Sequence, residues 1–146
     1  FDGKVMTTRE SARAGESWRR GPLVLAWSDT LGGIANPRDG RNVILHEFAH
    51  KLDEQDGVMD GAPELAPGQR RTWPAIFSRE FASLQQAVSG RYATLMDAYG
   101  ASSPPEFFAV AVETFFERPA SMRREHPELY AELCGWFRLD PAAWPR

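Results

Sequence analysis

The 146-residue chain has very little cysteine and histidine: one cysteine, Cys134, and three histidines. A single cysteine cannot form an internal disulfide, which agrees with a cytoplasmic protein, and that is the location we predict. Cys134 lies in an apolar helical pattern, where a cysteine is usually a small buried hydrophobe rather than a catalytic thiol. Closed structural zinc sites favour several cysteines, so the sequence also argues against a purely structural zinc site.

Long apolar runs and a strong excess of one charge are also absent. No run approaches the length of a membrane span, and no signal-peptide pattern opens the chain. The net charge is −3, which does not favour nucleic acid as a direct partner. Apolar residues make up 42% and charged residues 25% of the chain, as in ordinary globular proteins. We therefore expect neither a membrane nor nucleic acid to be a partner.

The size of the chain fits one domain. At 146 residues it can bury a substantial core without a second domain. The chain begins at Phe1 and not at a methionine. We therefore treat residues 1–146 as a single catalytic domain that can be a fragment of a longer chain.

The most informative stretch is His46-Glu-Phe-Ala-His50, an H-E-x-x-H motif. On a helix, residues four apart lie one above the other, so His46 and His50 can share one metal ion. Glu47 is offset from them by about a third of a turn, close enough to take a proton from water. Two imidazoles and a nearby carboxylate are typical of zinc hydrolases, so the motif predicts Zn²⁺ as cofactor and Glu47 as general base.

The residues around the motif predict a buried helix over about 43–54. Asn42 can cap it, and the apolar residues on either side of the histidines are Ile44, Leu45, Phe48, Ala49 and Leu52. Buried polar groups need partners. A metal ion satisfies this need, and the alternative is a histidine pair hydrogen-bonded within the core.

The rest of the chain predicts an α+β fold, mostly helical and zincin-like, with a small sheet near the N-terminus. Leu23–Trp27 reads as a strand, and residues 29–41 and 55–69 read as loops because of their glycine and proline content. Further helices are predicted over 72–88 with Thr72 as the cap, over 104–117, and from Pro127 onward.

A catalytic zinc site usually has three protein ligands. His126 follows an arginine-rich turn and reads as a surface residue. On the predicted helix 104–117, Glu106 and Glu113 lie two turns apart on one face, so either can approach the metal. Glu106 also completes an S-x-x-E capping box with Ser103, which would use its side chain at the helix start. Spacing alone does not separate Glu106 from Glu113.

Three segments together resemble a known family. They are His46-Glu-Phe-Ala-His-Lys-Leu-Asp53, Tyr99, and Pro105-Glu-Phe-Phe-Ala-Val110. Over roughly residues 20–140 the chain resembles the MtfA family of zinc peptidases, which is related to the catalytic domain of lethal factor. The resemblance implies that Glu106 is the third zinc ligand and that Tyr99 points into the site. Lethal factor also has a glutamate four residues after this ligand, at the position where this chain has Val110.

Tyr99 and Asp53 each have two interpretations. The Tyr99 hydroxyl can donate a hydrogen bond to an oxyanion, or Tyr99 can simply pack at a turn before a helix. Asp53 can hold an imidazole through its second nitrogen, or it can be a solvated acid at a helix end. Asp53 and Glu113 are both candidates to replace the glutamate that is absent at Val110.

The predicted function is a zinc-dependent, aminopeptidase-like metallopeptidase that acts on a peptide or protein substrate. Aminopeptidases hold the free amine of their substrate with an acidic group, and the spacing singles out none of the candidates Asp53, Asp56, Asp60 and Glu64.

The resemblance also implies a regulatory partner, the transcriptional repressor Mlc, and a link to the regulation of glucose uptake. The alternative function is therefore a binding module that sequesters a repressor, with weak or incidental hydrolysis. Glu47→Gln distinguishes the two functions, because it should abolish hydrolysis and leave binding intact.

Overall fold

The computed structural model describes residues 15–17, 23–25 and 27–145. A two-stranded antiparallel ladder pairs β1 (Gly15–Ser17) with β2 (Leu23–Leu25). The helices follow in the order α1 (Trp27–Ala35), α2 (Val43–Asp53), α3 (Gln69–Ser89), α4 (Pro104–Glu117), α5 (Pro119–Glu125) and α6 (Pro127–Phe137). Short 3-10 helices are η1 (Glu54–Asp56), η2 (Ala98–Ala101) and η3 (Pro141–Ala143).

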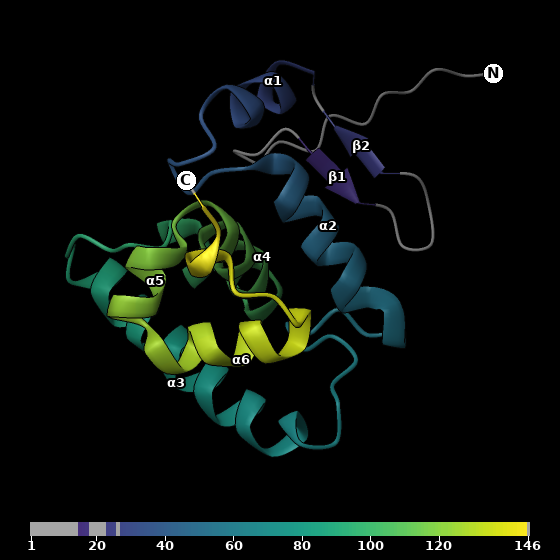
Figure 1. Cartoon of the computed structure of the whole chain (residues 1–146), viewed down its shortest axis with the longest axis vertical. Helices are drawn as coiled ribbons and strands as arrows, with labels where there is room; N and C mark the ends of the chain where they lie inside the picture. Colours follow the sequence, from purple (N-terminus) through teal and green to yellow (C-terminus); the bar gives the residue numbers. More distant parts are fainter. Residues whose placement is uncertain (1–14, 18–22, 26, 146) are drawn as a thin grey trace.

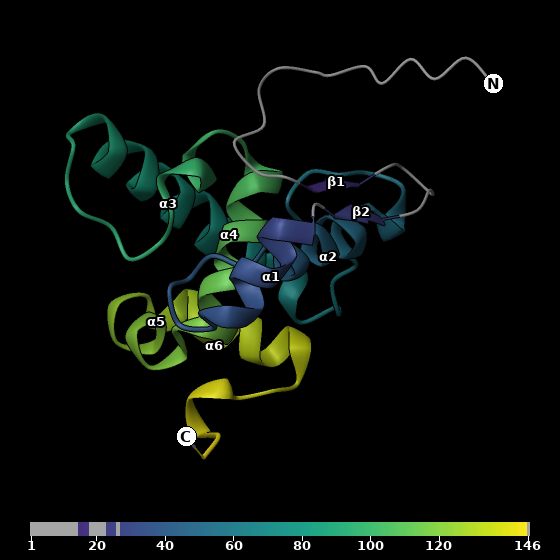
Figure 2. The ribbon, with the colours of Figure 1, turned by 90° about the horizontal axis from the view of Figure 1, so that it is seen from above.

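Helix α4 is the centre of the fold. Figure 1 and Figure 2 show it in the middle of the molecule, with α2 on one side and α3 on the other. Its sequence is apolar on nearly every face, which is typical of a helix surrounded by protein, and residues 107–115 are all buried. The core therefore forms around the helix that also carries Glu106 and Glu113.

Helix α3 covers one side of this core with an apolar stripe. Trp73, Phe77 and Leu84 are buried, while Ile76, Phe81 and Val88 pack against the core at its edge. The Trp73 and Phe77 rings are stacked with their centroids 4.0 Å apart. The helix predicted over 72–88 is present, but it begins at Gln69, after Gly68, so Thr72 is not its cap.

The α+β class predicted from the sequence is wrong, because the described fold is helical. Its layers are helices, and the ladder joins only three residues of each strand and lies beside α2 (Figure 1). The strand expected at Leu23–Trp27 ends at Leu25, and Trp27 already belongs to α1. A three-residue ladder is too short to bury a hydrophobic face against helices.

Two segments predicted to lack regular structure are helical. Residues 29–35 of the predicted loop 29–41 belong to α1 despite Gly32 and Gly33, because contact with α2 outweighs the low helix propensity of glycine. A Cβ on Gly33 would lie 3.4 Å from the side chain of Asn42, so α1 packs against the residue that precedes α2. The arginine-rich stretch before His126 is α5.

No helix of the described residues is both long enough and apolar enough to cross a membrane. Cys134 is free and partly buried, in keeping with a packing role.

Candidate metal centre

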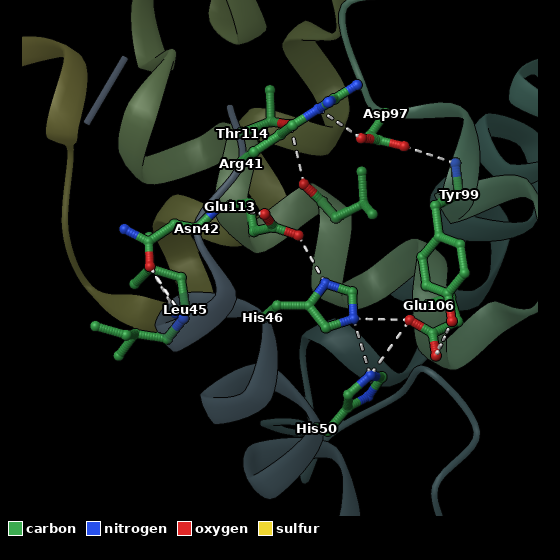
Figure 3. Close-up of polar contacts among 12 residues, drawn as sticks. Arg41, Asn42, Leu45, His46, His50, Asp97, Tyr99, Glu106, Glu113 and Thr114 are labelled. Carbon is green, nitrogen blue, oxygen red and sulfur yellow. Dashed lines mark hydrogen bonds and ion pairs between the residues drawn. The ribbon is translucent and has the colours of Figure 1, made fainter. Parts of the chain in front are cut away.

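The two histidines of the motif face each other from consecutive turns of α2. Asn42 caps this helix, and its Oδ1 accepts hydrogen bonds from the backbone N–H groups of Ile44 at 3.1 Å and Leu45 at 3.2 Å. His46 and His50 are both buried. Their Nε2 atoms lie 3.1 Å apart (Figure 3). The helix therefore brings two imidazole nitrogens to one point, as the spacing predicts.

Glu106 reaches the same point from the first turn of α4. Its Oε2 lies 2.8 Å from His46 Nε2 and 3.3 Å from His50 Nε2. Ser103 caps α4 by accepting the Glu106 N–H at 3.4 Å, but the Glu106 side chain turns to the histidines. Among the described residues, these three form a group whose possible ligand atoms all lie within 4.8 Å of one another.

The surroundings of Glu106 favour its ionised form. Burial alone would raise the pKa of this carboxyl, but hydrogen bonds and charge interactions with His46 and His50 outweigh burial and leave the pKa well below its usual range. A carboxylate that stays ionised is the form that binds a cation.

Glu113 contacts the opposite side of the His46 ring. Its fully buried carboxylate places Oε1 2.6 Å from His46 Nδ1, and Oε2 accepts the backbone N–H of Asn42 at 2.5 Å (Figure 3). A carboxylate oxygen accepts, so we assign the hydrogen of the first bond to Nδ1. In the neutral imidazole, Nε2 then presents its lone pair to the point shared with His50 and Glu106. The structure thus separates the two glutamates that spacing could not separate.

A second carboxylate on α4 completes this network. The Asn42 amide nitrogen donates to Glu117 Oε1 at 3.0 Å, and burial raises the Glu117 pKa. Asn42 therefore caps α2 and also joins it to two glutamates of α4. Sequence reasoning missed this link, although the spacing of Glu106, Glu113 and Glu117 by seven and four residues places all three on one helix face.

The two predicted catalytic side chains lie beside the group. Glu47 is buried next to His46 on α2. The Tyr99 hydroxyl donates to Glu106 Oε1 at 3.3 Å, and its ring centroid lies 6.1 Å from that of His46. Asp97 was not predicted, but it holds the Tyr99 backbone N–H at 2.8 Å and pairs with Arg41 at 3.0 Å (Figure 3). The bond to Tyr99 is a local cap of η2, of the kind that an Asp before a helical turn can signal. The pair with Arg41 joins two distant segments, and no sequence pattern reveals it.

Both sequence-based interpretations of Asp53 are wrong. Its carboxylate is buried and accepts the backbone N–H groups of Gly61 at 2.8 Å and Asp60 at 3.3 Å. It is neither solvated nor bonded to an imidazole in the described residues, and His50 Nδ1 is buried without a hydrogen-bond partner there. Burial raises the pKa of Asp53 to about 6.

His126 lies outside the group formed by His46, His50 and Glu106. It is half-buried rather than a surface residue, and its Nδ1 is 2.7 Å from Glu80 Oε2.

Comparisons with known proteins identify relatives along nearly the whole chain. An uncharacterized protein of Synechocystis sp. is 43% identical over 144 residues, covering 96% of this chain and 52% of that protein. Mlc titration factor A of Yersinia enterocolitica is 34% identical over 145 residues, covering 97% of this chain and 54% of its own length. Mlc titration factor A of Yersinia pestis is 35% identical over 137 residues, covering 92% of this chain and 50% of its own length.

The chain thus spans about half the length of the curated relatives it matches. A family model described as glucose-regulated metallo-peptidase M90 matches residues 2–138. The resemblance seen in the motifs is confirmed, and the chain belongs to the glucose-regulated metallo-peptidase M90 family.

Proposed function

We propose that the protein is a zinc-dependent peptidase whose metal is held by His46, His50 and Glu106. The observation that carries the proposal is the meeting of two imidazole nitrogens and one carboxylate oxygen within 2.8–3.3 Å of one another. Without a cation, two buried imidazoles and a partly buried carboxylate that meet at one point would be difficult to satisfy. Membership of a metallo-peptidase family supports the same assignment.

The donor set fits zinc. Zn²⁺ accepts imidazole nitrogen and carboxylate oxygen, and catalytic zinc sites use three protein ligands and keep one position open. Glu113 supports this role of His46, because a carboxylate on Nδ1 fixes the ring orientation and makes the other nitrogen a better donor. The zinc ion, when bound, supplies a Lewis acid that polarises a carbonyl and makes water more acidic.

The chain's own side chains supply the remaining chemistry. Glu47 is the general base that takes a proton from the attacking water and returns it to the leaving amine. Its burial next to His46 keeps it within the site. The Tyr99 hydroxyl donates a hydrogen bond to the oxyanion that forms on the substrate carbonyl, in place of the one that it donates to Glu106. Its hydrogen bond to Glu106 and the anchoring of its backbone by Asp97 support this position.

Peptides or proteins are the proposed substrates. An aminopeptidase also needs an acidic side chain that binds the free amine of the substrate. An amine-binding acid has to be free, and the Asp53 carboxylate is already bonded to two backbone N–H groups. Asp56, Asp60 and Glu64 are exposed. Asp56 and Asp60 each accept one backbone N–H through Oδ1, which leaves their second oxygen available, so these three acids are the better candidates. A peptide with an acetylated N-terminus tests the mode: an aminopeptidase cleaves the free peptide and not the acetylated one.

The relatives' name favours a second candidate function. Both Yersinia relatives described above are called Mlc titration factor A, so we also propose binding to an Mlc-like transcriptional repressor. Glu47→Gln separates the two activities. It should abolish hydrolysis, because the general base is lost, and leave repressor and zinc binding intact.

The metal site is tested by zinc content and zinc affinity of the purified protein and of Glu106→Ala. We expect about one zinc per chain in the parent and a loss of affinity in the variant, because one of three ligands is removed. Glu117→Ala is the matched control, since it removes a carboxylate from the same face of α4 without touching the histidines. Zinc binding that is unchanged in Glu106→Ala, or absent from the parent, contradicts the proposal.

A further inference from the structure

The segment that follows α2 is fixed to the end of that helix by a buried carboxylate. Asp53 is the last residue of α2 and is 0% exposed. Its two oxygens accept the backbone N–H groups of Asp60 and Gly61 at 3.3 and 2.8 Å. The chain therefore leaves α2 through η1, turns, and comes back to the same helix end at Gly61.

At Gly61 this returning segment meets the start of α4. Gly61 has a φ of +83°, and a Cβ built on it would lie 2.5 Å from the carbonyl oxygen of Pro104 and 2.7 Å from its carbonyl carbon. The Trp73 indole N–H also approaches the Gly61 carbonyl oxygen at 3.4 Å. Gly61 is thus enclosed by a side chain of α2, the backbone of α4 and an indole of α3.

The place of this contact matters because Pro104 is the first residue of α4 and Glu106 lies in the same turn. His50 lies one turn before Asp53 on α2. The contact Asp53–Gly61–Pro104 therefore joins the end of the helix that carries the histidines to the start of the helix that carries the carboxylate. Movement of Pro104 would carry Glu106 with it and change its distances of 2.8 and 3.3 Å to the two imidazoles.

We propose that the Asp53–Gly61–Pro104 contact is a positioning device that sets the place of the Glu106 carboxylate relative to His46 and His50. Asp53 and Gly61 are then positioning residues of the metal centre, although neither touches the point where the three ligand atoms meet. This inference rests on the proposed metal site. It predicts that damage to the contact weakens metal binding and changes its geometry, beyond any loss of stability.

The same segment contains a matched control for the glycine. Gly57 also has a positive φ, +93°, but a Cβ on it would meet nothing within 4 Å. Gly57→Ala and Gly61→Ala both place an alanine in a left-handed conformation, at a similar conformational cost. Only Gly61→Ala presses on the backbone of Pro104, so the difference between the two variants isolates the contact with α4.

The experiment measures zinc affinity by competition with a chelator and the visible absorption of the Co²⁺-substituted protein, which reports ligand geometry. Loss of a residue that orients a ligand typically weakens metal binding about 10–100-fold. We expect a loss in that range and an altered cobalt spectrum for Gly61→Ala. For Gly57→Ala we expect parental affinity and spectrum. Equal zinc affinity and equal cobalt spectra in the two variants would overturn the inference.

If Gly61→Ala does not fold, a second pair of variants tests whether the Asp53–Gly61–Pro104 contact affects zinc binding. Asp53→Asn retains one acceptor oxygen for two backbone N–H groups, and Asp56→Asn removes the same charge at an exposed position nearby. Weaker zinc binding in Asp53→Asn alone supports the inference, and equal binding overturns it. A parent that binds no zinc, or a Glu106→Ala variant that binds as well as the parent, refutes the metal site itself and is distinguishable from both results.

Discussion

The two ends of α2 are tied to α4 in different ways. At the N-terminal end the tie is made by side chains: Asn42 and His46 are bonded to Glu113, and Asn42 also to Glu117. At the C-terminal end the contact is made by backbone: Gly61 packs against Pro104 of α4, and its N–H donates to the Asp53 carboxylate. The two histidines also differ in what their Nδ1 atoms contact. Glu113 holds His46 through Nδ1, whereas no described residue hydrogen-bonds to Nδ1 of His50.

This comparison shows how two ligands can be fixed by different means. Glu113 bonds to the His46 ring at Nδ1, on the side away from the ligand atoms, so a single side-chain change there should disturb the orientation of the ring. The positions of His50 and Glu106 depend on the helix ends being held at the right separation, so backbone substitutions should disturb them. The metal centre is therefore sensitive to side-chain changes at one end of α2 and to loop changes at the other.

The largest effect is expected from Glu113→Ala at the N-terminal end. It leaves the His46 Nδ1–H and the Asn42 N–H without a partner in a buried site, and each such group costs about 1–3 kcal/mol. We expect the free energy of unfolding of the zinc-free protein to fall by about 4 kcal/mol and zinc affinity to fall about 10–100-fold. Urea denaturation and chelator competition measure the two effects.

Glu117→Ala provides the contrast for this experiment. It removes a buried carboxylate that is bonded to Asn42 and not to a histidine. We expect lower stability with unchanged zinc affinity. A similar loss of zinc affinity in both variants would contradict the role that we assign to Glu113.

The second effect concerns pH at the C-terminal end. The pKa of Asp53 is about 6 in the folded protein, against about 3.9 in an unfolded chain. Between these values the folded state keeps a proton that the unfolded state has lost, so the contribution of Asp53 to stability falls as pH rises from 4 to 6. The difference in unfolding free energy, parent minus Asp53→Asn, should decrease by about 2 kcal/mol over this range.

Urea denaturation of the zinc-free proteins at pH 4, 5, 6 and 7 gives this difference. Subtracting the variant removes the contributions of other carboxylates, including that of Glu106, whose pKa is shifted the opposite way. A difference that rises with pH would mean that the two backbone hydrogen bonds outweigh the burial of the charge.

The smallest effect is expected on the outer face of α2, between the two ends. Phe48 lies within the motif, yet 54% of its surface is exposed. Phe48→Ser should therefore change the free energy of unfolding by less than about 0.5 kcal/mol and leave zinc affinity unchanged. Urea denaturation and chelator competition provide the check. A loss comparable to that of Glu113→Ala would show that the outer face of α2 is also part of the centre.

The helices of the site were the part of the fold that the sequence predicted well. Asn42 and Ser103 are strong capping residues, and both cap helices in the structure. The helix predicted over 104–117 is α4, which ends at Glu117 as expected. His46 and His50 were placed on one helix face and Glu106 at the start of another helix, and the structure brings them together. Their role as zinc ligands stays a prediction.

What the sequence could not predict depends on contacts between distant segments. Glycines suggested a loop where α1 packs against α2. The partners of Asp53 are backbone groups seven and eight residues later, which carry no side-chain signal. Glu106 and Glu113 share a helix face. Only the way α4 packs against α2 decides that Glu106 contacts Nε2 of His46 and Glu113 contacts Nδ1.

The burial of α4 has a consequence for how the protein can be studied. The helix that carries Glu106 is also the centre of the hydrophobic core, so the proposed zinc site is lost when the core unfolds. A ligand that binds only the folded state at 100 times its dissociation constant stabilises that state by about 2.7 kcal/mol. The melting temperature should therefore serve as a gauge of metal occupancy, readable without any substrate.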